Sequence, residues 1–358
     1  MRVVVTGATG NIGTSVIHSL SGDDRITEIL GVARRVPDWK PPKTTFLAED
    51  IRAPSLAESW RGADAVVHLA WAFQPTHRPL ETWDVNVIGG IRAFEAAAMA
   101  GASTLVYASS VGAYSPGDGR RVDESWPTHS VPTAAYGREK AYLERYLDAF
   151  EHRHPHMRVV RLRPAFVFQR AAASEQRRIF ASPLLPPWLV RRGRIPAIPA
   201  PAGLRFQAVH ARDAAEAFRL AIVGDARGAF NVAAEPVIDL DRLGSLLGAR
   251  PIAVPAAAAR VAVGVAWRLH LVRADHELLR LFLRLPLLDA GRAHRELGWT
   301  PAYTGVEAIS EMLDGMADGA GGPTAPLKPA GGRVGHAATA IDSDVHERER
   351  VWRAHARR

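Results

Sequence analysis

The first thirteen residues constrain the fold of this 358-residue chain more than any other stretch. The β-branched run Val3-Val4-Val5-Thr6 is typical of a strand that is buried on both faces of a parallel sheet. Three glycines then follow at a spacing of three, and apolar residues recur at helical spacing at Ile12, Val16, Ile17 and Leu20. The pattern predicts a strand, a glycine-rich turn and a helix.

This turn has the form of an anion cradle. Glycines let backbone amides approach a pyrophosphate, and the helix N-terminus faces that anion with the positive end of its dipole. The motif therefore predicts a dinucleotide site. The alternative is a glycine-rich turn without a ligand, and the strand and helix on either side favour the dinucleotide.

Composition narrows the class of protein. The length suffices for one large α/β domain or two lobes. Cysteine is absent, which excludes disulfides and thiolate metal sites, and we find no metal-ligand constellation. No leader pattern precedes the first strand, so we expect a cytoplasmic protein. We predict no integral membrane span, because Arg260 and Arg268 interrupt the most apolar stretch, 252–272.

The net charge of +8 raises the question of nucleic-acid binding. The cations are almost all arginines spread along the chain, and no basic run is interleaved with aromatic residues. We therefore expect a small-molecule substrate and no nucleic-acid partner.

The residues after the second predicted strand, Ile29 to Ala33, bear on the choice of cofactor. In NAD sites an acidic residue about 20 positions past the glycines binds the ribose 2′-hydroxyl. Here Arg34 and Arg35 stand in that region. Guanidinium groups suit a 2′-phosphate, which favours NADP over NAD. Two solvated arginines beside an NAD site are the alternative.

An acidic residue follows the third predicted strand, Thr45 to Leu47. Asp50 could accept a hydrogen bond from the adenine amino group, or it could cap a helix.

Hydroxyl groups gather at one predicted sheet edge. The strand that begins at Thr104 ends in Ser109 and Ser110, at the carboxyl edge where α/β sheets place their chemistry. Tyr136 and Lys140 are four residues apart on one helix face. A neighbouring ammonium group lowers a tyrosine pKa, and a serine hydroxyl can orient a carbinol. A surface helix pair is the alternative, and the order of the motifs favours proton transfer.

At this point the chain resembles the extended short-chain dehydrogenases/reductases, the NAD-dependent epimerase/dehydratase group, over about residues 1 to 305. The matching motifs are Thr6 to Gly13, Val67 to Ala70, Asn86, Tyr107 to Tyr114, Tyr136 to Lys140, Arg161 to Pro164, Val209-His210 with Asp213, Phe230 to Val232, and Leu297 to Pro301. The resemblance implies a catalytic hydroxyl at Ser110, an acid-base at Tyr136, and a residue at Lys140 that binds the nicotinamide ribose and tunes the tyrosine.

The resemblance also implies the contacts of the cofactor. Together with Arg34, Arg35 and Asp50, the expected cofactor-binding residues are Gly7, Thr9, Gly10, Asn11, Ile12, Gly13, Ile51, Leu69, Ala70, Asn86 and Pro164. Members of the group often pair through two long helices, here Val85 to Ala100 and Tyr136 to Phe150, so we expect a homodimer.

Departures from the family pattern bear on the substrate. Sugar-nucleotide dehydratases carry an acidic pair after the catalytic hydroxyl, where this chain has Val111 and Gly112. Galactose-type epimerases carry a lysine where this chain has Phe73, and an asparagine where it has Phe166. Trp71, Phe73 and Phe166 would instead form an apolar wall, which favours a substrate other than a UDP-sugar.

The sequence predicts a Rossmann-type doubly wound parallel sheet with a small C-terminal lobe. Residues 1–168 and 205–235 form the NAD(P)-binding domain, and 169–204 and 236–315 form the substrate lobe. Residues 236–300 have the pattern of helices. The basic amphipathic run 278–288 either packs on the lobe or a dimer partner, or lies at a membrane surface. From 316 the composition predicts a flexible tail.

We therefore expect an NAD(P)-dependent oxidoreductase that acts at a secondary alcohol or ketone. One alternative is a nucleotide-sugar epimerase that holds its NAD tightly. Another, of a different class, is a sensor or interaction protein that binds NAD(P) without turnover.

Overall fold

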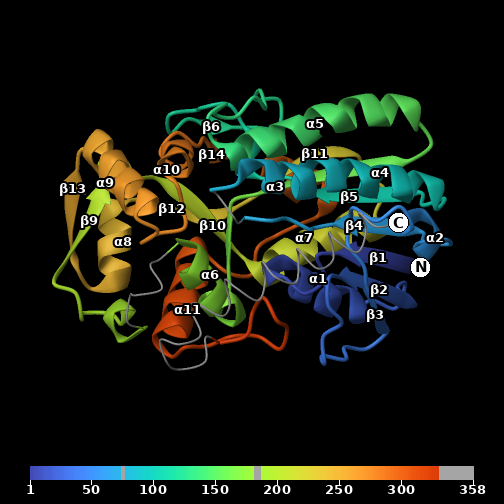
Figure 1. Ribbon diagram of the computed structural model, residues 1–358, viewed down its shortest axis with the longest axis horizontal. Helices are drawn as coiled ribbons and strands as arrows, with labels where there is room; N and C mark the ends of the chain where they lie inside the picture. Colours follow the sequence, from blue (N-terminus) through green and yellow to red (C-terminus); the bar gives the residue numbers. More distant parts are fainter. Residues whose placement is uncertain (74–76, 181–186, 330–358) are drawn as a thin grey trace. The chain divides into compact units, whose positions relative to one another are not determined.

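A parallel seven-stranded sheet is the centre of the computed structural model, which describes residues 1–73, 77–180 and 187–329 (Figure 1). Its strands lie in the order β11 (Gly228–Val232), β7 (Arg158–Pro164), β5 (Thr104–Ala108), β4 (Ala65–His68), β1 (Arg2–Thr6), β2 (Glu28–Ala33) and β3 (Thr44–Ala48). This order winds outward in both directions from β1, which confirms the predicted doubly wound α/β fold.

Burial on both faces explains the β-branched run of β1. Val3 and Val5 point into the core under α1 (Asn11–Ser21) and α7 (Ala211–Val223). Val4 points to the opposite face, whose core includes residues of α4 (Gly89–Met99) and α5 (Ala135–Arg153). Alternate residues of a strand face opposite ways, so a strand between two helical layers is apolar throughout. Figure 1 shows the two helical layers.

Short helical turns connect the strands of this sheet. The chain between β3 and α4 contains α2 (Leu56–Ser59), α3 (Pro79–Trp83) and a π-helical turn at Asp84–Ile88. The sequence predicts one helix from Val85 to Ala100, and the structure begins it with this π-helical turn. Other 3₁₀ or π-helical turns lie at Val111–Ala113, Arg170–Ala172, Pro187–Val190 and Ala293–Leu297.

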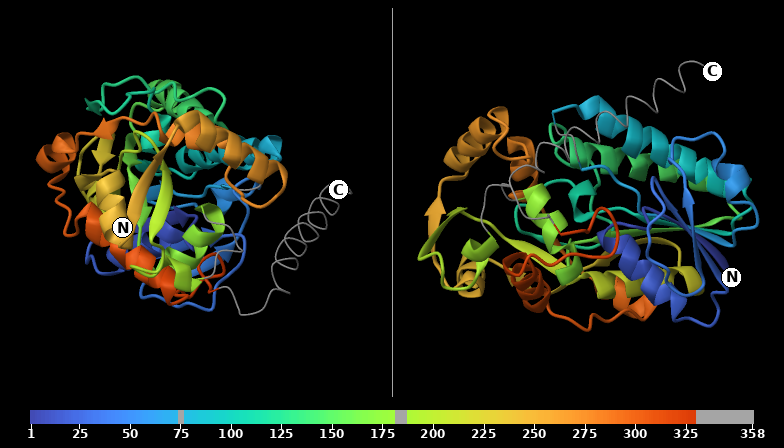
Figure 2. Two further views of the ribbon diagram at one scale, coloured as in Figure 1. Left: turned by 90° about the vertical axis from the view of Figure 1, so that its left-hand side faces the viewer. Right: turned by 60° about the horizontal axis from the view of Figure 1, so that its bottom comes forward.

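The remaining elements form a smaller lobe beside the carboxyl edge of the sheet (Figure 2). Its helices are α6 (Ala173–Phe180), α8 (Leu240–Leu247), α9 (Ala256–Arg268), α10 (His276–Phe282) and α11 (Gly305–Ala317). Three of its strands, β8 (Phe166–Phe168), β10 (Phe206–His210) and β12 (Ala234–Ile238), form one sheet. Strand β9 (Ala197–Pro201) pairs with β13 (Arg250–Val254), and β6 (Arg121–Val122) pairs with β14 (Leu287–Leu288). The domain boundaries drawn from the sequence stay predictions.

The helical pattern predicted for residues 236–300 is wrong in part. Strands β12, β13 and β14 lie in or extend into that stretch, between the helices. Pro236 and Pro251 stand in two of these strands and disfavour helix there. β13 pairs with β9 about fifty residues earlier in the chain, and such a partner leaves no local periodicity.

The amphipathic run 278–288 packs onto the lobe. Leu278 and Leu281 are buried in the same core as Val111 and Tyr114. This arrangement confirms the first of its two interpretations. Among the described residues, no helix combines the length and the apolar character needed to cross a membrane.

The chain beyond α11 remains packed where the sequence predicts a flexible tail from 316. Residues as far as Lys328 belong to one compact unit. Thr324 and Leu327 are both fully buried, and the Thr324 hydroxyl donates to the carbonyl oxygen of Thr9 at 2.6 Å. The rest of the predicted tail, 330–358, lies outside the described residues.

Candidate active site

The glycine-rich turn packs its backbone directly against the end of β4. Gly7 has a φ of +67°, and a Cβ there would lie 2.7 Å from the amide nitrogen of Ala70. A Cβ at Gly13 would lie 2.2 Å from the carbonyl oxygen of Gly7. Residues with side chains cannot occupy either position without a backbone shift. The two glycines therefore keep the turn and the start of α1 close to the sheet.

A buried threonine and histidine hold the other side of this turn. The Thr6 hydroxyl oxygen accepts hydrogen bonds from the amides of Leu69 and Ala70, at 3.2 and 3.4 Å. The same oxygen lies 2.9 Å from Nδ1 of His68. Burial, assisted by the charge of Lys140, lowers the pKa of His68 to about 3, so this imidazole is neutral. These contacts set the path of the chain from β4 into residues 69–73.

The N-terminus of α1 is free of side-chain capping. Gly10 is its N-cap, and within the described part of the chain this helix has no side-chain cap hydrogen bond. The first amides of a helix have no acceptor within the helix, and its dipole favours an anion at this end. The cradle of Gly7, Gly10 and Gly13 therefore fits a dinucleotide pyrophosphate.

Replacing Gly13 by alanine should weaken dinucleotide binding at least about tenfold, because its Cβ would collide with backbone atoms that cannot rotate away. Gly22→Ala at the other end of α1 is the matched control, since its Cβ would lie 3.6 Å from the nearest atom, the Ser19 carbonyl oxygen. Binding can be followed by the fluorescence of the reduced dinucleotide. Equal affinities of the two variants would contradict this role of Gly13.

The side chain of Asn11 is bound to the lobe rather than to the turn. Its Nδ2 donates to the Val167 carbonyl oxygen at 3.0 Å, and Gln169 Nε2 donates to its carbonyl and Oδ1 at 2.8 and 2.9 Å. Thr9 likewise contacts the C-terminal segment through its carbonyl oxygen. These two predicted cofactor residues therefore connect the turn to residues 167–169 and to Thr324, and their contact with a cofactor stays a prediction.

The residues expected near the adenosine lie at the ends of β2 and β3. Arg34 and Arg35 follow β2 and are exposed. Asp50 follows β3, and its two carboxylate oxygens accept from Nε and a terminal nitrogen of Arg52 at 2.9 and 2.8 Å. Burial would raise the pKa of Asp50, but Arg52 and the charge of Arg34 lower it overall. Arg34 and Asp50 thus lie close enough to interact, at the same sheet edge.

The other predicted cofactor residues line the same edge. Ile51 is buried, and Ile12 lies at the start of α1 beside the core. Leu69 and Ala70 follow β4. Pro164 ends β7, in register with Val232 of β11.

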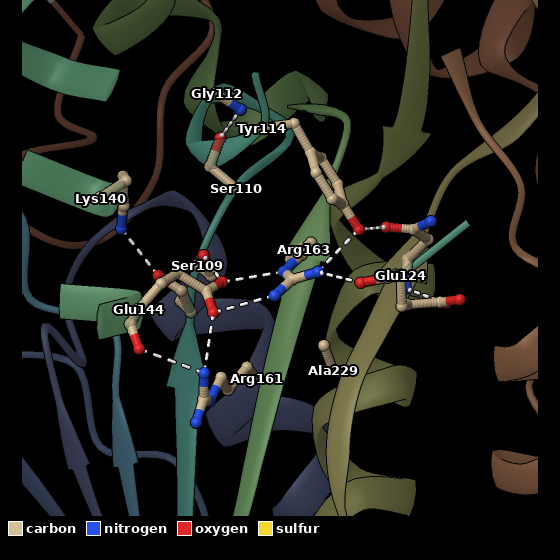
Figure 3. Close-up of polar contacts among 12 residues, drawn as sticks. Ser109, Ser110, Gly112, Tyr114, Glu124, Lys140, Glu144, Arg161, Arg163 and Ala229 are labelled. Carbon is tan, nitrogen blue, oxygen red and sulfur yellow. Dashed lines mark hydrogen bonds and ion pairs between the residues drawn. The ribbon is translucent and has the colours of Figure 1, made fainter. Parts of the chain in front are cut away.

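Ser110 and Tyr136 meet at the carboxyl end of β5. The Ser110 hydroxyl oxygen accepts from the Gly112 amide at 3.0 Å, which orders the turn after β5 (Figure 3). The Tyr136 ring lies against this turn, because a Cβ at Gly112 would be 2.7 Å from Cε1 of Tyr136. Burial raises the pKa of Tyr136 to about 12, against the opposing effect of a hydrogen bond with Ser110. Tyr136 therefore keeps its proton at neutral pH.

Lys140 lies one helical turn further along α5 and is buried. Its Nζ donates to the Ala108 carbonyl oxygen at 2.7 Å and lies 3.5 Å from the centre of the Trp71 ring. Burial lowers the pKa of Lys140 to about 7, and the charges of Glu139 and Glu144 partly oppose this. A lysine with this pKa is only partly charged at neutral pH.

The expected lowering of the Tyr136 pKa by Lys140 is absent from this structure. Burial dominates, and the resulting pKa is higher than that of a free tyrosine. The physical reason is that aromatic rings remove water from the phenol: the Phe73 ring stacks on it at 5.0 Å, and the Trp71 ring meets it edge-on at 5.6 Å.

The three residues of the predicted apolar wall occupy two places. Trp71 and Phe73 flank Tyr136 directly. Phe166 lies in β8 and packs instead against the rings of Phe206 and Phe282, at 5.3 and 4.9 Å. The rings of Trp71 and Phe73 therefore contact the candidate acid-base, whereas the ring of Phe166 packs against other phenylalanines.

Asn86 positions the loop that carries these rings. Its amide oxygen accepts from the Ala72 amide at 2.7 Å, and its Nδ2 donates to the Ala72 carbonyl and to Glu139 at 2.9 and 2.7 Å. Glu139 is itself buried and also accepts from Thr82 at 2.8 Å. The Asn86 side chain thus joins α5 to residues 70–73, and its predicted contact with the cofactor is untested.

A buried ionic network lies beneath the site, and the sequence motifs do not predict it. Arg163 donates to both oxygens of Glu144, at 2.8 and 2.9 Å, and Arg161 donates to Glu144 at 3.2 Å (Figure 3). Ser109 donates to the same carboxylate at 2.6 Å. Arg163 also donates to the Tyr114 hydroxyl at 2.9 Å. The network joins α5, β5 and β7 directly below Ser110.

Electrostatic pairing makes Glu144 an anion at all ordinary pH values. Its burial would raise the pKa, but the hydrogen bonds from Arg163 and the charges of both arginines lower it to about 2. A signal for this network is present in the sequence. Arg161 and Arg163 stand among the apolar residues of β7 and need a buried acid, and Glu144 is four residues after Lys140 on the same helix.

Comparison with known proteins identifies the family of this chain. A sequence profile of the NAD dependent epimerase/dehydratase family matches residues 3–233. The chain belongs to this family. An uncharacterized protein of Mycobacterium tuberculosis is 25% identical over 324 residues, which cover 87% of this chain and 83% of that protein. The L-arabinose 1-dehydrogenase (NAD(P)(+)) of Haloferax volcanii is 34% identical over 109 residues, 30% of this chain and 40% of that enzyme.

The family also has solved structures with this fold. UDP-glucose-4-epimerase from Stenotrophomonas maltophila, with bound NAD and formylated UDP-arabinopyranose, superposes with a TM-score of 0.68 at 20% identity. The match covers 89% of this chain and 98% of that one. At this identity the likeness establishes the fold.

Proposed function

We propose that this protein is an NAD(P)-dependent oxidoreductase that interconverts a secondary alcohol and a ketone. The observation that carries the proposal is the meeting of Ser110 and Tyr136 at the carboxyl edge of a sheet whose glycine cradle fits a dinucleotide. Lys140 lies on the same face of α5, one turn away. Three groups suited to orienting a carbonyl and moving a proton thus lie beside a cofactor cradle.

When bound, a nicotinamide dinucleotide supplies a hydride donor or acceptor at C4 of its ring. Ser110 orients the substrate oxygen by a hydrogen bond. Tyr136, which holds its proton at neutral pH, donates that proton to the substrate oxygen as a ketone becomes an alcohol, and accepts it in the reverse direction. Lys140 would hold the ribose of the cofactor and, when charged, would stabilise the tyrosinate.

The side chains around Tyr136 indicate an apolar substrate. Trp71 and Phe73 cover the phenol, and Val111 and Gly112 follow Ser110 where an eliminating carboxylate would stand. Without that carboxylate at these positions, water cannot be expelled by the dehydratase route. We therefore propose ketones and lactols with hydrophobic substituents as the substrate class.

We propose NADP as the cofactor. Arg34 and Arg35 are exposed at the end of β2, where a 2′-phosphate would receive charge-assisted hydrogen bonds. Replacing both by alanine should weaken NADPH binding by about tenfold or more and change NADH binding by less than about threefold. Arg194→Ala, another exposed arginine, is the control and should change neither affinity. An equal loss for both dinucleotides would contradict a 2′-phosphate contact.

A nucleotide-sugar epimerase is the second candidate, and the structural relative with bound NAD and a UDP-sugar favours it. An epimerase oxidises and re-reduces one carbon, so it consumes no coenzyme overall. The absence of the epimerase lysine at Phe73 and of the asparagine at Phe166 weighs against it.

Isotope transfer distinguishes the two. The protein is incubated with NADPH deuterated at nicotinamide C4 and a panel of apolar ketones, and in parallel with NAD and UDP-glucose or UDP-galactose. The oxidoreductase produces an alcohol with deuterium on the carbinol carbon and oxidises one NADPH for each product. Interconversion of the UDP-sugars without net coenzyme change would instead support the epimerase.

A further inference from the structure

Helix α9 presents an unusual apolar face to solvent. Val261, Val265 and Leu269 follow each other at a spacing of four and are 68, 49 and 63% exposed. Leu271 just beyond the helix and Ile252 on β13 are 45 and 51% exposed. We call these five residues the α9 patch. They are half of the ten large apolar side chains that stand out as exposed among the described residues.

The chain segment that carries the α9 patch has basic residues and no acidic ones. Between Asp241 and Asp275 the chain has no acidic residue, and the same interval contains Arg242, Arg250, Arg260, Arg268 and Arg273. Two of these arginines are paired with carboxylates: Arg260 lies 3.2 Å from Glu277, and Arg242 lies 3.3 Å from Asp239. Arg268 is exposed at the end of α9.

Helix α9, which carries the patch, is held by contacts with neighbouring residues. The Trp267 ring on α9 stacks on His77 with ring centres 4.1 Å apart, and His77 Nε2 lies 3.1 Å from the Trp267 carbonyl oxygen. The buried residues Leu278 and Leu281 tie α10, the neighbour of α9, to a core that includes Val111 and Tyr114. The exposed face of α9 therefore belongs to an ordered element.

The location of α9 suits contact with a large surface. The helix lies beside β13 and α10 at the end of the lobe that is remote from strands β1 to β3 (Figures 1 and 2). Its exposed side chains stand outward along a helix. Protein partners bind most tightly through recessed pockets that receive an anchoring side chain. Outward apolar side chains with neighbouring arginines instead suit the interfacial region of a bilayer.

A second copy of the chain fits the α9 patch poorly. A twofold interface brings the same surface of both copies together. Arg268 would then approach the arginines of the other copy, and residues 242–274 offer no carboxylate to balance them. Like charges at an interface cost affinity, whereas an anionic surface gains from them.

We propose that the α9 patch docks on an anionic lipid bilayer, with the apolar side chains inserted at the interface and the arginines among the headgroups. An interface of this kind combines burial of apolar side chains with attraction between cations and anionic headgroups. The proposal concerns binding alone and does not depend on the reaction proposed above.

Vesicle sedimentation tests the proposal with the full-length protein. We expect binding to phosphatidylcholine vesicles that contain about 30% phosphatidylglycerol to exceed binding to pure phosphatidylcholine at least about fivefold, and to fall at high salt. The triple change Val261→Ser, Val265→Ser and Leu269→Ser should lower the bound fraction at least about tenfold. Arg268→Glu should weaken binding to the anionic vesicles alone.

Matched controls separate the patch from apolar exposure in general. Leu80→Ser and Met99→Ser remove side chains that are 83 and 77% exposed elsewhere, and should leave vesicle binding unchanged. Equal binding to both vesicle types, or equal loss in patch and control variants, would overturn the proposal. Self-association that disappears only in the triple variant, without vesicle binding by the original protein, would also overturn it in favour of a second copy.

Discussion

Replacing Tyr136 by phenylalanine is expected to lower the turnover number by a factor of about 10² to 10⁴, the usual contribution of a positioned acid-base group. The change removes the one hydroxyl that can exchange a proton with the substrate oxygen. The phenyl ring still fills the space between Gly112, Trp71 and Phe73, so the dinucleotide affinity should change by less than about threefold. Steady-state kinetics and a binding titration measure the two effects separately.

Tyr142→Phe is the matched control on the same helix. Tyr142 is 45% exposed and its ring packs against Trp83, away from the candidate site. Its hydroxyl should be dispensable for turnover. If Tyr136→Phe keeps the turnover of the original protein, the proposed acid-base assignment is wrong, whatever the substrate.

Replacing Glu144 by glutamine is expected to lower the free energy of unfolding by about 3–5 kcal/mol at neutral pH, because Arg163 would remain buried without its countercharge. Arg161 keeps its ion pairs with Asp148 and Glu151, so the loss falls mainly on Arg163. Adding Arg163→Met removes the unpaired charge and should recover part of the loss. Urea unfolding measures all three proteins.

The effect of Glu144 should depend on pH in a defined direction. Its pKa is about 2 in the folded protein and 4.5 for a free glutamate. A carboxyl group with a lowered folded pKa stabilises the protein fully above its unfolded pKa and loses this effect as the pH falls through its folded pKa. The stability difference between the original protein and Glu144→Gln should therefore be constant above about pH 5 and shrink toward pH 2.

The exposed pair of Glu81 and Arg78 provides the control. Its side chains are 42 and 61% exposed, so Glu81→Gln should change the unfolding free energy by less than about 1 kcal/mol. A loss from Glu144→Gln no larger than this would mean that the network contributes little to folding.

The sequence predicts the parallel sheet well because its buried strands are largely runs of apolar residues that can be recognised locally. The run Val3 to Val5 is apolar at every position, as a strand covered on both faces must be. Positions 7 and 13 must be glycine for steric reasons, so the turn is also visible in the sequence. Tyr136 and Lys140 lie on α5 at the predicted spacing.

Features that depend on distant contacts are not visible in the same way. Helix α5 reads as a charged, solvated helix, yet Glu139 and Glu144 are buried because Asn86 and Arg163 reach them from other elements. The pKa of Tyr136 depends on Trp71 and Phe73, which lie in the segment after β4. Burial by these rings reverses the pKa shift expected from Lys140 alone.

In the lobe, secondary structure and packing also depend on contacts between residues far apart in the sequence. Alanine- and leucine-rich residues 236–300 have a helical composition, but the pairing of β13 with β9 is decided by tertiary contacts. The glycine- and proline-rich segment after α11 looks flexible, yet Thr324 and Leu327 fix it against the glycine-rich turn and the lobe. Two buried side chains are too few to change the glycine- and proline-rich composition from which the flexible tail is predicted.

The central claim is that the cradle of Gly7, Gly10 and Gly13 holds a dissociable NADP beside Tyr136. Its most direct test is to purify the protein without added nucleotide, denature a sample to identify any bound nucleotide, and titrate the rest with NADPH and NADH. We predict little retained nucleotide, and one NADPH bound per chain at least about tenfold more tightly than NADH. Stoichiometric release of NAD, or no binding of either dinucleotide, would contradict the claim.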